Sequence, residues 1–151
     1  MCLSLLLTLG ASNGIGKEVA IEFAKLGANV CIVGRNAERL QKTFDECQQN
    51  KIIVEQKVVQ FVFDISKEAD AERLVKETIE QLGQLDVLVN NAGVLEYGSI
   101  ESTTLEQYDR VMNINLRAVY HLTMLSVPHL VQTKGFLLLP FDFNKKIYLI
   151  P

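Results

Sequence analysis

Residues 3–16 read LSLLLTLGASNGIG, and this stretch decides the fold. An apolar run that suits a buried strand, residues 3–9, leads into a turn with three glycines, and an amphipathic stretch follows. Glycine allows the positive φ of a tight turn, and its missing Cβ lets backbone N–H groups approach a phosphate. Because glycines can also serve only to turn the chain, the position between strand and helix is what favours dinucleotide binding. The turn residues that we expect at a cofactor are Gly10, Ser12, Asn13, Gly14, Ile15 and Gly16.

The alternation of strand and helix continues along the chain. Further apolar runs that suit buried parallel strands lie at residues 29–33, 58–63 and 85–89. The helix after the glycine turn is expected to present one apolar face and to end at Gly27. The residues of that face are Ile15, Val19, Phe23 and Leu26. The third helix is expected to begin at a Ser66 cap and to end at Gly83.

A longer helix is predicted in the second half of the chain. Thr104 and Gln107 have the spacing of a capping box, and the helical pattern runs from there to about His129. A short apolar run then follows at residues 136–139, and Pro140 ends it. This run is the candidate for a fifth strand.

Strands separated by helices of this length predict an α/β fold. We expect a Rossmann-like, doubly wound parallel sheet that is incomplete, with four to five strands. Residues 1–135 are expected to form a partial nucleotide-binding domain. Residues 136–151 are expected to form an atypical C-terminal tail, because residues 141–151 show no period and lead into no helix. That segment is interpreted as a loose tail or an edge strand.

Composition limits the classes of function. A chain of 151 residues with 48% hydrophobic and 22% charged side chains suits one globular domain. A net charge of −3 without a basic cluster argues against nucleic-acid binding. The apolar run at residues 3–9 is far shorter than the roughly 20 residues of a membrane-spanning helix, so no membrane association is expected. Three cysteines without C-x-x-C spacing indicate neither a disulfide framework nor a metal site, and they favour a reduced, cytoplasmic location.

The end of the second predicted strand bears on cofactor choice. Arg35 and Asn36 stand about 20 residues after the glycine turn, where NAD-preferring sites carry an acid for the ribose diol. No acid is present there. Because a planar guanidinium suits a 2′-phosphate, we expect NADP as the cofactor, with NAD the less favoured choice. The alternative is that Arg35 is a solvated loop residue.

Polar residues also follow the third and fourth predicted strands. Asp64 and Ile65 come after the third strand, where Asp64 could instead cap the next helix. Asn-Asn-Ala-Gly at residues 90–93 comes after the fourth. Asparagines at a strand end can cross-link neighbouring loops through buried amide hydrogen bonds, and Ala and Gly leave space beside a cofactor.

Two asparagines, Asn113 and Asn115, interrupt the apolar face of the long helix. Asparagine is a mediocre helix former, so its presence there suggests a specific role. The alternative is that both are simply exposed helix residues.

Together these motifs resemble the short-chain dehydrogenase/reductase family. The resemblance rests on Gly-x-x-x-Gly-x-Gly at residues 10–16, on residues 90–93 and on the helix asparagines, and it covers roughly residues 3–135. Leu9 stands where the family has threonine. The resemblance implies hydride transfer between a nicotinamide and a small carbonyl or alcohol substrate. It also implies that Asp64 accepts from the adenine amino group, that Asn115 helps to hold a catalytic proton-relay water, and that a set of strand-end residues lies at the cofactor: Asn90, Ala92 and Gly93.

The family's catalytic serine and Tyr-x-x-x-Lys pair have no counterpart in the sequence. The residues four positions beyond the first three tyrosines are Glu101, Met112 and Met124, and the chain stops before that position after Tyr148. A phenol with a pKa near 10 needs a neighbouring cation to act as a base at neutral pH. We therefore expect an NADP(H)-dependent oxidoreductase by ancestry, truncated after its nucleotide-binding half and inactive.

Two alternatives remain open. The chain could be a non-catalytic nucleotide-binding or subunit-interaction module, because in the family the long helix packs against another subunit. The helix over residues 104–131 would then meet a second copy or a full-length relative. A chain that does not fold stably is the other alternative, since a fifth strand without its following helix leaves a sheet edge uncovered.

Overall fold

The computed structural model describes residues 4–139 and 148–149. Its centre is a six-stranded sheet in the order β3-β2-β1-β4-β5-β6. The first five strands of the chain pair in parallel, and β6 pairs antiparallel with β5. The strands are β1 Leu5–Leu9, β2 Asn29–Gly34, β3 Val58–Val62, β4 Val87–Val89, β5 Phe136–Leu138 and β6 Tyr148–Leu149.

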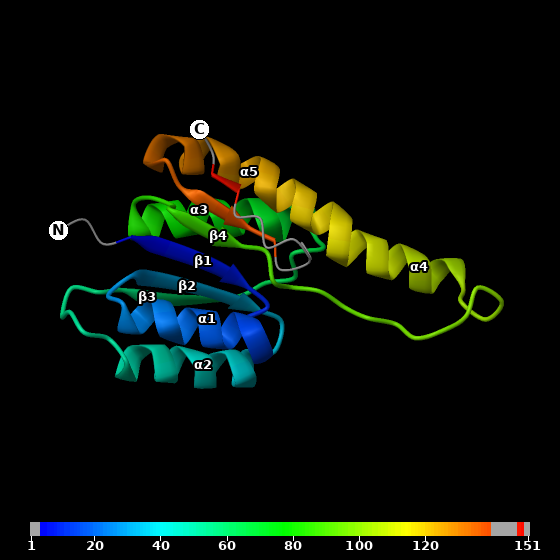
Figure 1. Ribbon diagram of the computed structural model, residues 1–151, viewed down its shortest axis with the longest axis horizontal. Coiled ribbons are helices and arrows are strands. Elements are labelled where there is room, and N and C mark those ends of the chain that lie inside the picture. The colour runs from blue at the N-terminus through cyan, green and yellow to red at the C-terminus, as the bar shows by residue number, and fades with distance from the viewer. Residues whose placement is uncertain (1–3, 140–147, 150–151) are drawn as a thin grey trace.

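Helices cover both faces of the sheet (Figure 1). One face carries α1 and α2, and the other carries α3 together with one long helix made of α4, η1 and α5. This arrangement confirms the predicted Rossmann-like, doubly wound sheet. The helices are α1 Gly14–Lys25, α2 Ala37–Gln49, α3 Glu68–Leu82, α4 Leu105–Met112, the π-helix η1 Asn113–Arg117 and α5 Ala118–Thr133.

The central strand β1 is buried on both sides, which explains its continuous apolar sequence. Alternate side chains of a strand point to opposite faces. Leu5, Leu7 and Leu9 join the core beneath α3 and α5, whereas Leu6 joins the core beneath α1 and α2. The chain order reverses direction between β1 and β4, so the carboxyl ends of these strands form the crevice where such sheets bind ligands.

The predicted apolar face of α1 is confirmed in part, because Val19 and Phe23 pack against the core. Ile15 and Leu26 are 67% and 77% exposed, and the buried residues are Gly16, Ala20, Ile21 and Ala24. Small side chains let the helix lie close to the sheet, so its most buried face centres on them together with Ile21. Gly27 does end the helix, with φ of 84°.

The predicted start of α3 was wrong. The N-cap residue is Lys67, which makes no side-chain capping bond, and the Ser66 hydroxyl donates instead to Asp64 Oδ1 at 2.7 Å. The predicted end is confirmed, because Gly83 adopts the left-handed conformation with φ of 88°. Such a C-terminal glycine satisfies the last turn without a Cβ clash.

The long helix begins as predicted and ends later. Thr104 and Gln107 form both hydrogen bonds of a capping box. The helix continues through Pro128 to Thr133, beyond the predicted end near His129. The sequence pattern did not indicate the π-helix η1 in its middle.

The predicted fifth strand is confirmed at Phe136–Leu138. Tyr148–Leu149 form an edge strand beside it, which agrees with one of the two interpretations of the tail. The other predictions for residues 140–147 and 150–151 lie outside the described residues. Within the described part of the chain, no helix is long and apolar enough to cross a membrane.

Candidate functional site

A cavity of about 360 Å³ opens at the carboxyl ends of β1, β2 and β3, beside the start of α1. Its walls come from the glycine turn, from the segments that follow β2 and β3, and from the segment that follows β4. Most of the predicted site residues meet here: Gly10, Ser12, Asn13, Arg35, Asn36, Asp64, Ile65, Ala92 and Gly93.

The glycine turn has the backbone that its sequence predicts. Gly10 and Gly14 take φ of 67° and 59°, the left-handed region that favours glycine. A Cβ on Gly10 would also lie 2.9 Å from the Ala92 Cα, so this residue is constrained twice. Asn13 caps α1 by accepting from the Gly14 N–H at 2.8 Å. The turn therefore presents the N-terminal end of α1, where an anion is favoured.

The asparagines after β4 cross-link neighbouring segments, as the sequence predicted. The Asn91 Nδ2 donates to the carbonyls of Leu9 and Gly10 at 3.2 and 3.4 Å. The Asn90 Nδ2 donates to the Thr123 hydroxyl on α5 at 3.1 Å. Asn91 thus ties the segment after β4 to the glycine turn, and Asn90 ties it to the opposite helix layer.

The segment after β2 brings cationic side chains to the cavity. Arg35 is exposed and follows Gly34, and the Asn36 Oδ1 accepts from the Arg39 N–H at 2.8 Å to cap α2. Arg39 therefore lies in the first turn of the helix and lines the same cavity as Arg35. A Cβ on Gly34 would overlap the Ser12 hydroxyl, so β2 passes close to the glycine turn at this residue. Two guanidinium groups thus border the cavity.

Asp64 supplies the only carboxylate among the residues that line this cavity. Its Oδ1 accepts from both the backbone N–H and the hydroxyl of Ser66, at 3.1 and 2.7 Å. Partial burial raises the pKa of Asp64, but the Ser66 hydrogen bonds and the charges of Arg35 and Lys67 outweigh it, so the pKa lies below its ordinary value. The group is therefore an ionised hydrogen-bond acceptor at neutral pH.

Asn115 occupies the π-helix η1 and holds the segment after β4. Its Oδ1 accepts from the Val94 N–H and its Nδ2 donates to the Val94 carbonyl, both at 2.8 Å. Asn115 itself does not line the cavity, whereas the neighbouring Ile114 does. Short π-helical segments inside α-helices are found frequently at functional sites.

Some predicted residues lie away from the cavity wall: Gly14, Ile15, Gly16, Asn90 and Asn115. Sequence reasoning missed other residues of the wall: Val33, Gly34, Arg39, Phe63 and Ile114. Val33, Gly34 and Phe63 were detectable as neighbours of the chosen strand-end residues. Arg39 could have been found from its place three residues after the Asn36 cap.

The tyrosines with described side chains lie outside this cavity. Tyr97, Tyr108 and Tyr120 are 88%, 55% and 70% exposed. The thiols of Cys31 and Cys47 are buried, and this burial raises the pKa of each to about 12, so neither is a nucleophile at neutral pH. No group of three His, Cys, Asp or Glu side chains in residues 4–139 could hold a metal ion.

Comparison with known proteins agrees with this geometry. An uncharacterized oxidoreductase of Thermotoga maritima is 37% identical over 130 residues, which make up 85% of this chain and 49% of the relative. The apo glucose dehydrogenase of Caenorhabditis elegans is 40% identical with a TM-score of 0.79, covering 89% of this chain and 52% of that one. An alcohol dehydrogenase of Thermococcus sibiricus, complexed with 5-hydroxy-NADP, is 28% identical with a TM-score of 0.82, covering 89% and 56%.

This chain spans about half the length of these relatives. The family model for short chain dehydrogenases matches residues 5–138, from the first residue of β1 to the last residue of β5. The match includes the glycine turn, the strand ends and the asparagines that build the cavity. The chain therefore belongs to the short-chain dehydrogenase/reductase family of NAD(P)-using oxidoreductases.

Proposed function

We propose that this chain binds NADP(H) as the nucleotide-binding half of an oxidoreductase that moves hydride between the nicotinamide and a small carbonyl or alcohol substrate. The observation that carries the proposal is the pair of arginines, Arg35 and Arg39, at the cavity beside the glycine turn. A 2′-phosphate carries the negative charge that distinguishes NADP from NAD, and planar guanidinium groups suit it. The Thermococcus sibiricus relative, which was solved with 5-hydroxy-NADP, supports this choice.

Different parts of the cofactor would contact different parts of the cavity. The glycine turn, residues 10–16, would hold the pyrophosphate at the N-terminus of α1. The Asp64 carboxylate would accept from the adenine amino group, with Ile65 beside the ring. Asn90, Ala92 and Gly93 would border the nicotinamide end. The ionised state of Asp64 at neutral pH supports the acceptor role.

A fluorescence titration tests the cofactor proposal. We expect saturable NADPH binding that Arg35→Ala weakens about tenfold to hundredfold, since hydrogen bonds to charged groups contribute roughly 1.5–3 kcal/mol. NADH binding should change less than about twofold. Lys25→Ala is the matched control, because Lys25 is a partly exposed cation on α1 that pairs with Glu22 away from the cavity. Equal NADPH affinity in Arg35→Ala and the parent would contradict the proposal.

We further propose that this polypeptide does not catalyse turnover by itself. No Tyr-x-x-x-Lys is present in the sequence, so the proton donor that the family uses is absent. In an active family member, the residue that matches Asn115 would help to hold the relay water. A steady-state assay with NADP(H) or NAD(H) and a panel of ketones and alcohols should give no turnover. Turnover that a substitution at Asn115 abolishes would disprove this.

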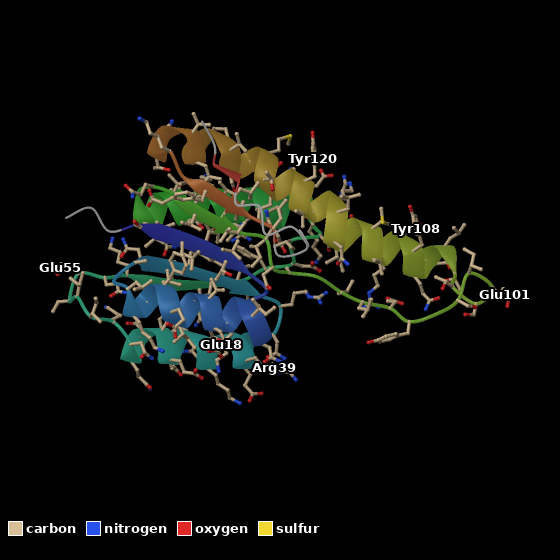
Figure 2. All side chains as sticks on the ribbon, in the orientation of Figure 1. Glu18, Arg39, Glu55, Glu101, Tyr108 and Tyr120 are labelled. Carbon is tan, nitrogen blue, oxygen red and sulfur yellow. The ribbon has the colours of Figure 1, made fainter. Side chains whose placement is uncertain are left out.

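A second candidate function is subunit association through residues 104–131. Leu116, Tyr120 and Met124 recur every four residues and are 58%, 70% and 53% exposed, so they form one apolar stripe along η1 and α5. Tyr108 and Tyr120 point outward from the long helix (Figure 2). A groove of about 720 Å³ lies along the same face, lined by Met112, Leu116 and Tyr120 among others. This surface supports association with a second copy or a full-length relative.

Sedimentation velocity tests the association. We expect the parent chain to sediment as a dimer or larger species, and Leu116→Glu to sediment as a monomer because it buries a charge in the interface. Val54→Glu is the matched control, because Val54 is 90% exposed in the segment between α2 and β3, on another part of the molecule. A parent chain that sediments as a monomer, alone and when mixed with a full-length relative, would rule out this function.

Residence in the cytoplasm also remains a prediction, and imaging of the tagged chain in cells would test it.

A further inference from the structure

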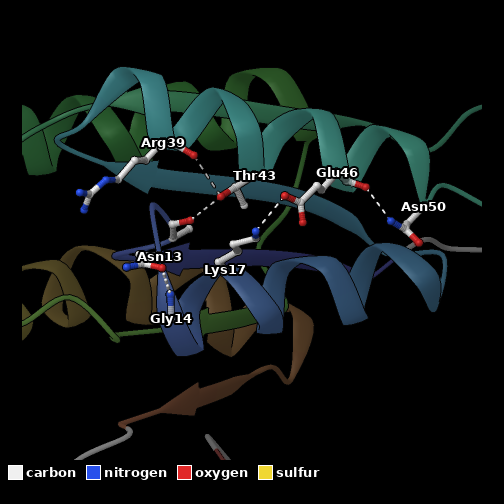
Figure 3. A network of polar contacts seen from close by, with 8 residues as sticks. Asn13, Gly14, Lys17, Arg39, Thr43, Glu46 and Asn50 are labelled. Carbon is white, nitrogen blue, oxygen red and sulfur yellow. Dashed lines mark hydrogen bonds and ion pairs between the residues drawn. The ribbon is translucent and has the colours of Figure 1, made fainter.

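Thr43 on α2 is completely buried and makes a hydrogen bond to the glycine turn. Its hydroxyl donates to the Ala11 carbonyl at 2.9 Å, and the Arg39 carbonyl lies 3.3 Å from the same oxygen. A hydroxyl has one hydrogen to donate, and the Arg39 carbonyl is the acceptor that any helical threonine can use. The shorter contact, to Ala11, is specific to this fold. The side chain of Thr43 points from α2 toward the turn that precedes α1 (Figure 3).

Ala11 is held on both sides of its backbone. Its N–H donates to the Val33 carbonyl on β2 at 3.0 Å, while its carbonyl accepts from Thr43. The peptide group between Ala11 and Ser12 is planar and trans, so fixing the Ala11 carbonyl also fixes the direction of the Ser12 N–H. Ser12 lines the cavity. Thr43 therefore sets the orientation of a backbone donor in the part of the glycine turn that faces the cavity.

The same helix carries the cationic end of the cavity. Asn36 caps α2 and Arg39 lies in its first turn, so Thr43 fixes the distance between these groups and the glycine turn. A second link joins α1 to α2, the ion pair between Lys17 and Glu46 at 2.8 Å. Its side chains are 26% and 42% exposed, so water can replace it at little cost. The buried Thr43 bond has no such replacement, because its loss leaves the Ala11 carbonyl without a donor.

We propose that Thr43 is a positioning residue for the cofactor, which holds the glycine turn in register with Arg35 and Arg39. This inference rests on the proposed NADP(H) binding. A ligand that contacts both the turn and the arginines should depend on Thr43. A ligand that contacts the arginines but carries no pyrophosphate should not.

Calorimetric titration with two ligands separates these cases. NADPH carries both the pyrophosphate and the 2′-phosphate, whereas adenosine 2′-monophosphate carries only the latter. Thr43→Val keeps the shape and removes the donor, and we expect about fivefold to tenfold weaker NADPH binding. The affinity for adenosine 2′-monophosphate should stay within about twofold of the parent. Thr43→Ser keeps the hydroxyl and should restore NADPH affinity to within about threefold of the parent.

Thr78→Val is the matched control. Thr78 is 1% exposed on α3, and its hydroxyl lies 3.5 Å from the Cys31 sulfur, in the helix layer on the other face of the sheet. Its substitution also removes a buried hydroxyl, but it should leave NADPH affinity within about twofold of the parent. The inference is overturned if Thr43→Val binds NADPH like the parent, if it weakens both ligands equally, or if Thr43→Ser fails to restore binding.

Hydrogen exchange of the ligand-free protein keeps the two proposals apart. If the parent binds neither ligand, the NADP(H) proposal fails, and the effect of Thr43 on the turn is then read from the backbone amides alone. We expect faster exchange across residues 10–16 in Thr43→Val and no change there in Thr78→Val. Unchanged exchange in Thr43→Val would overturn the inference that Thr43 holds the glycine turn.

Discussion

The segments that follow β1, β2 and β3 differ from the segment that follows β4 in how many charged and polar side chains they place around the cavity. At the first three strands, a capped helix, two arginines and an ionised carboxylate surround one cavity. Beyond β4, the segment before α4 projects past the sheet (Figure 1), and its apolar side chains Leu95, Tyr97 and Ile100 are 72%, 88% and 98% exposed. The cavity is therefore bordered mainly by residues that follow the first three strands, whereas much of the segment between β4 and α4 is exposed to solvent.

Buried polar atoms do not divide in the same way. The Asn91 amide is bonded to two carbonyls of the glycine turn. The Asn90 Oδ1 is buried and has no hydrogen-bond partner among the described residues. The Ser12 Oγ on the glycine turn is likewise buried without a partner among the described residues, so unpaired polar atoms occur at the glycine turn as well as after β4.

The largest effect should come from Gly10→Val, because Gly10 lies in the glycine turn that lines the cavity. Valine at this position would be strained by the left-handed φ of 67° and would clash with the Ala92 backbone. We expect a loss of about 3 kcal/mol in the free energy of unfolding, measured by urea denaturation, and no measurable NADPH binding.

Gly83→Val is the control for Gly10→Val. Gly83 has a similar φ of 88° with no neighbouring atom within 4 Å of an added Cβ. Gly83→Val should lower the free energy of unfolding by about 1 to 2 kcal/mol through backbone strain alone, and it should leave NADPH affinity unchanged. If the two variants lose equal stability, the contact between Gly10 and Ala92 contributes nothing.

A smaller effect on stability is expected from Thr104→Ala, at the start of α4 and away from the cavity. This change removes the hydroxyl that accepts from the Gln107 N–H to cap α4, and it leaves the Thr104 N–H that donates to the Gln107 Oε1. It should lower the free energy of unfolding by about 1 kcal/mol, measured by thermal denaturation, without altering NADPH affinity. A large loss of NADPH affinity would show that the start of α4 is coupled to the cavity.

The smallest effect concerns pH. The pKa of Asp64 is lowered in the folded protein, so ionised Asp64 stabilises the fold above its unfolded pKa of about 3.9, and this contribution is lost as the pH falls through the lower folded value. We expect Asp64→Asn to show a slightly smaller loss of stability between pH 5 and pH 3 than the parent. Urea denaturation across that range measures it. An equal or larger pH dependence in the variant would show that the carboxylate is not stabilised in the fold.

Much of the sheet could be predicted from the sequence, because apolar runs and glycines act locally. The five parallel strands, the capping box at Thr104 and the stop at Gly83 all follow from short patterns. The errors arose where tertiary contacts compete with local preference. The most buried face of α1 centres on small residues and Ile21, so Ile15 and Leu26 are exposed, and Ser66 bonds to Asp64 instead of capping α3.

The cavity was predictable where its residues directly follow strands, as Arg35 and Asp64 do. Arg39 and Thr43 were missed because their contribution depends on how α2 packs against the glycine turn. The π-helix at Asn113–Arg117 was missed because its hydrogen-bond shift leaves no pattern in residue types. The pairing of Asn115 with the Val94 backbone likewise joins segments 21 residues apart.

The central proposal is that the cavity beside the glycine turn binds NADP(H) in preference to NAD(H). Amide chemical-shift mapping with NADP⁺ and NAD⁺, each added to the parent chain at the same concentration, tests it most directly. The account predicts that NADP⁺ shifts resonances at residues 10–16, 35–39, 64–65 and 92–93, and that NAD⁺ shifts them less or not at all at that concentration. Equal shifts with both cofactors, or no shifts at these residues, would contradict it.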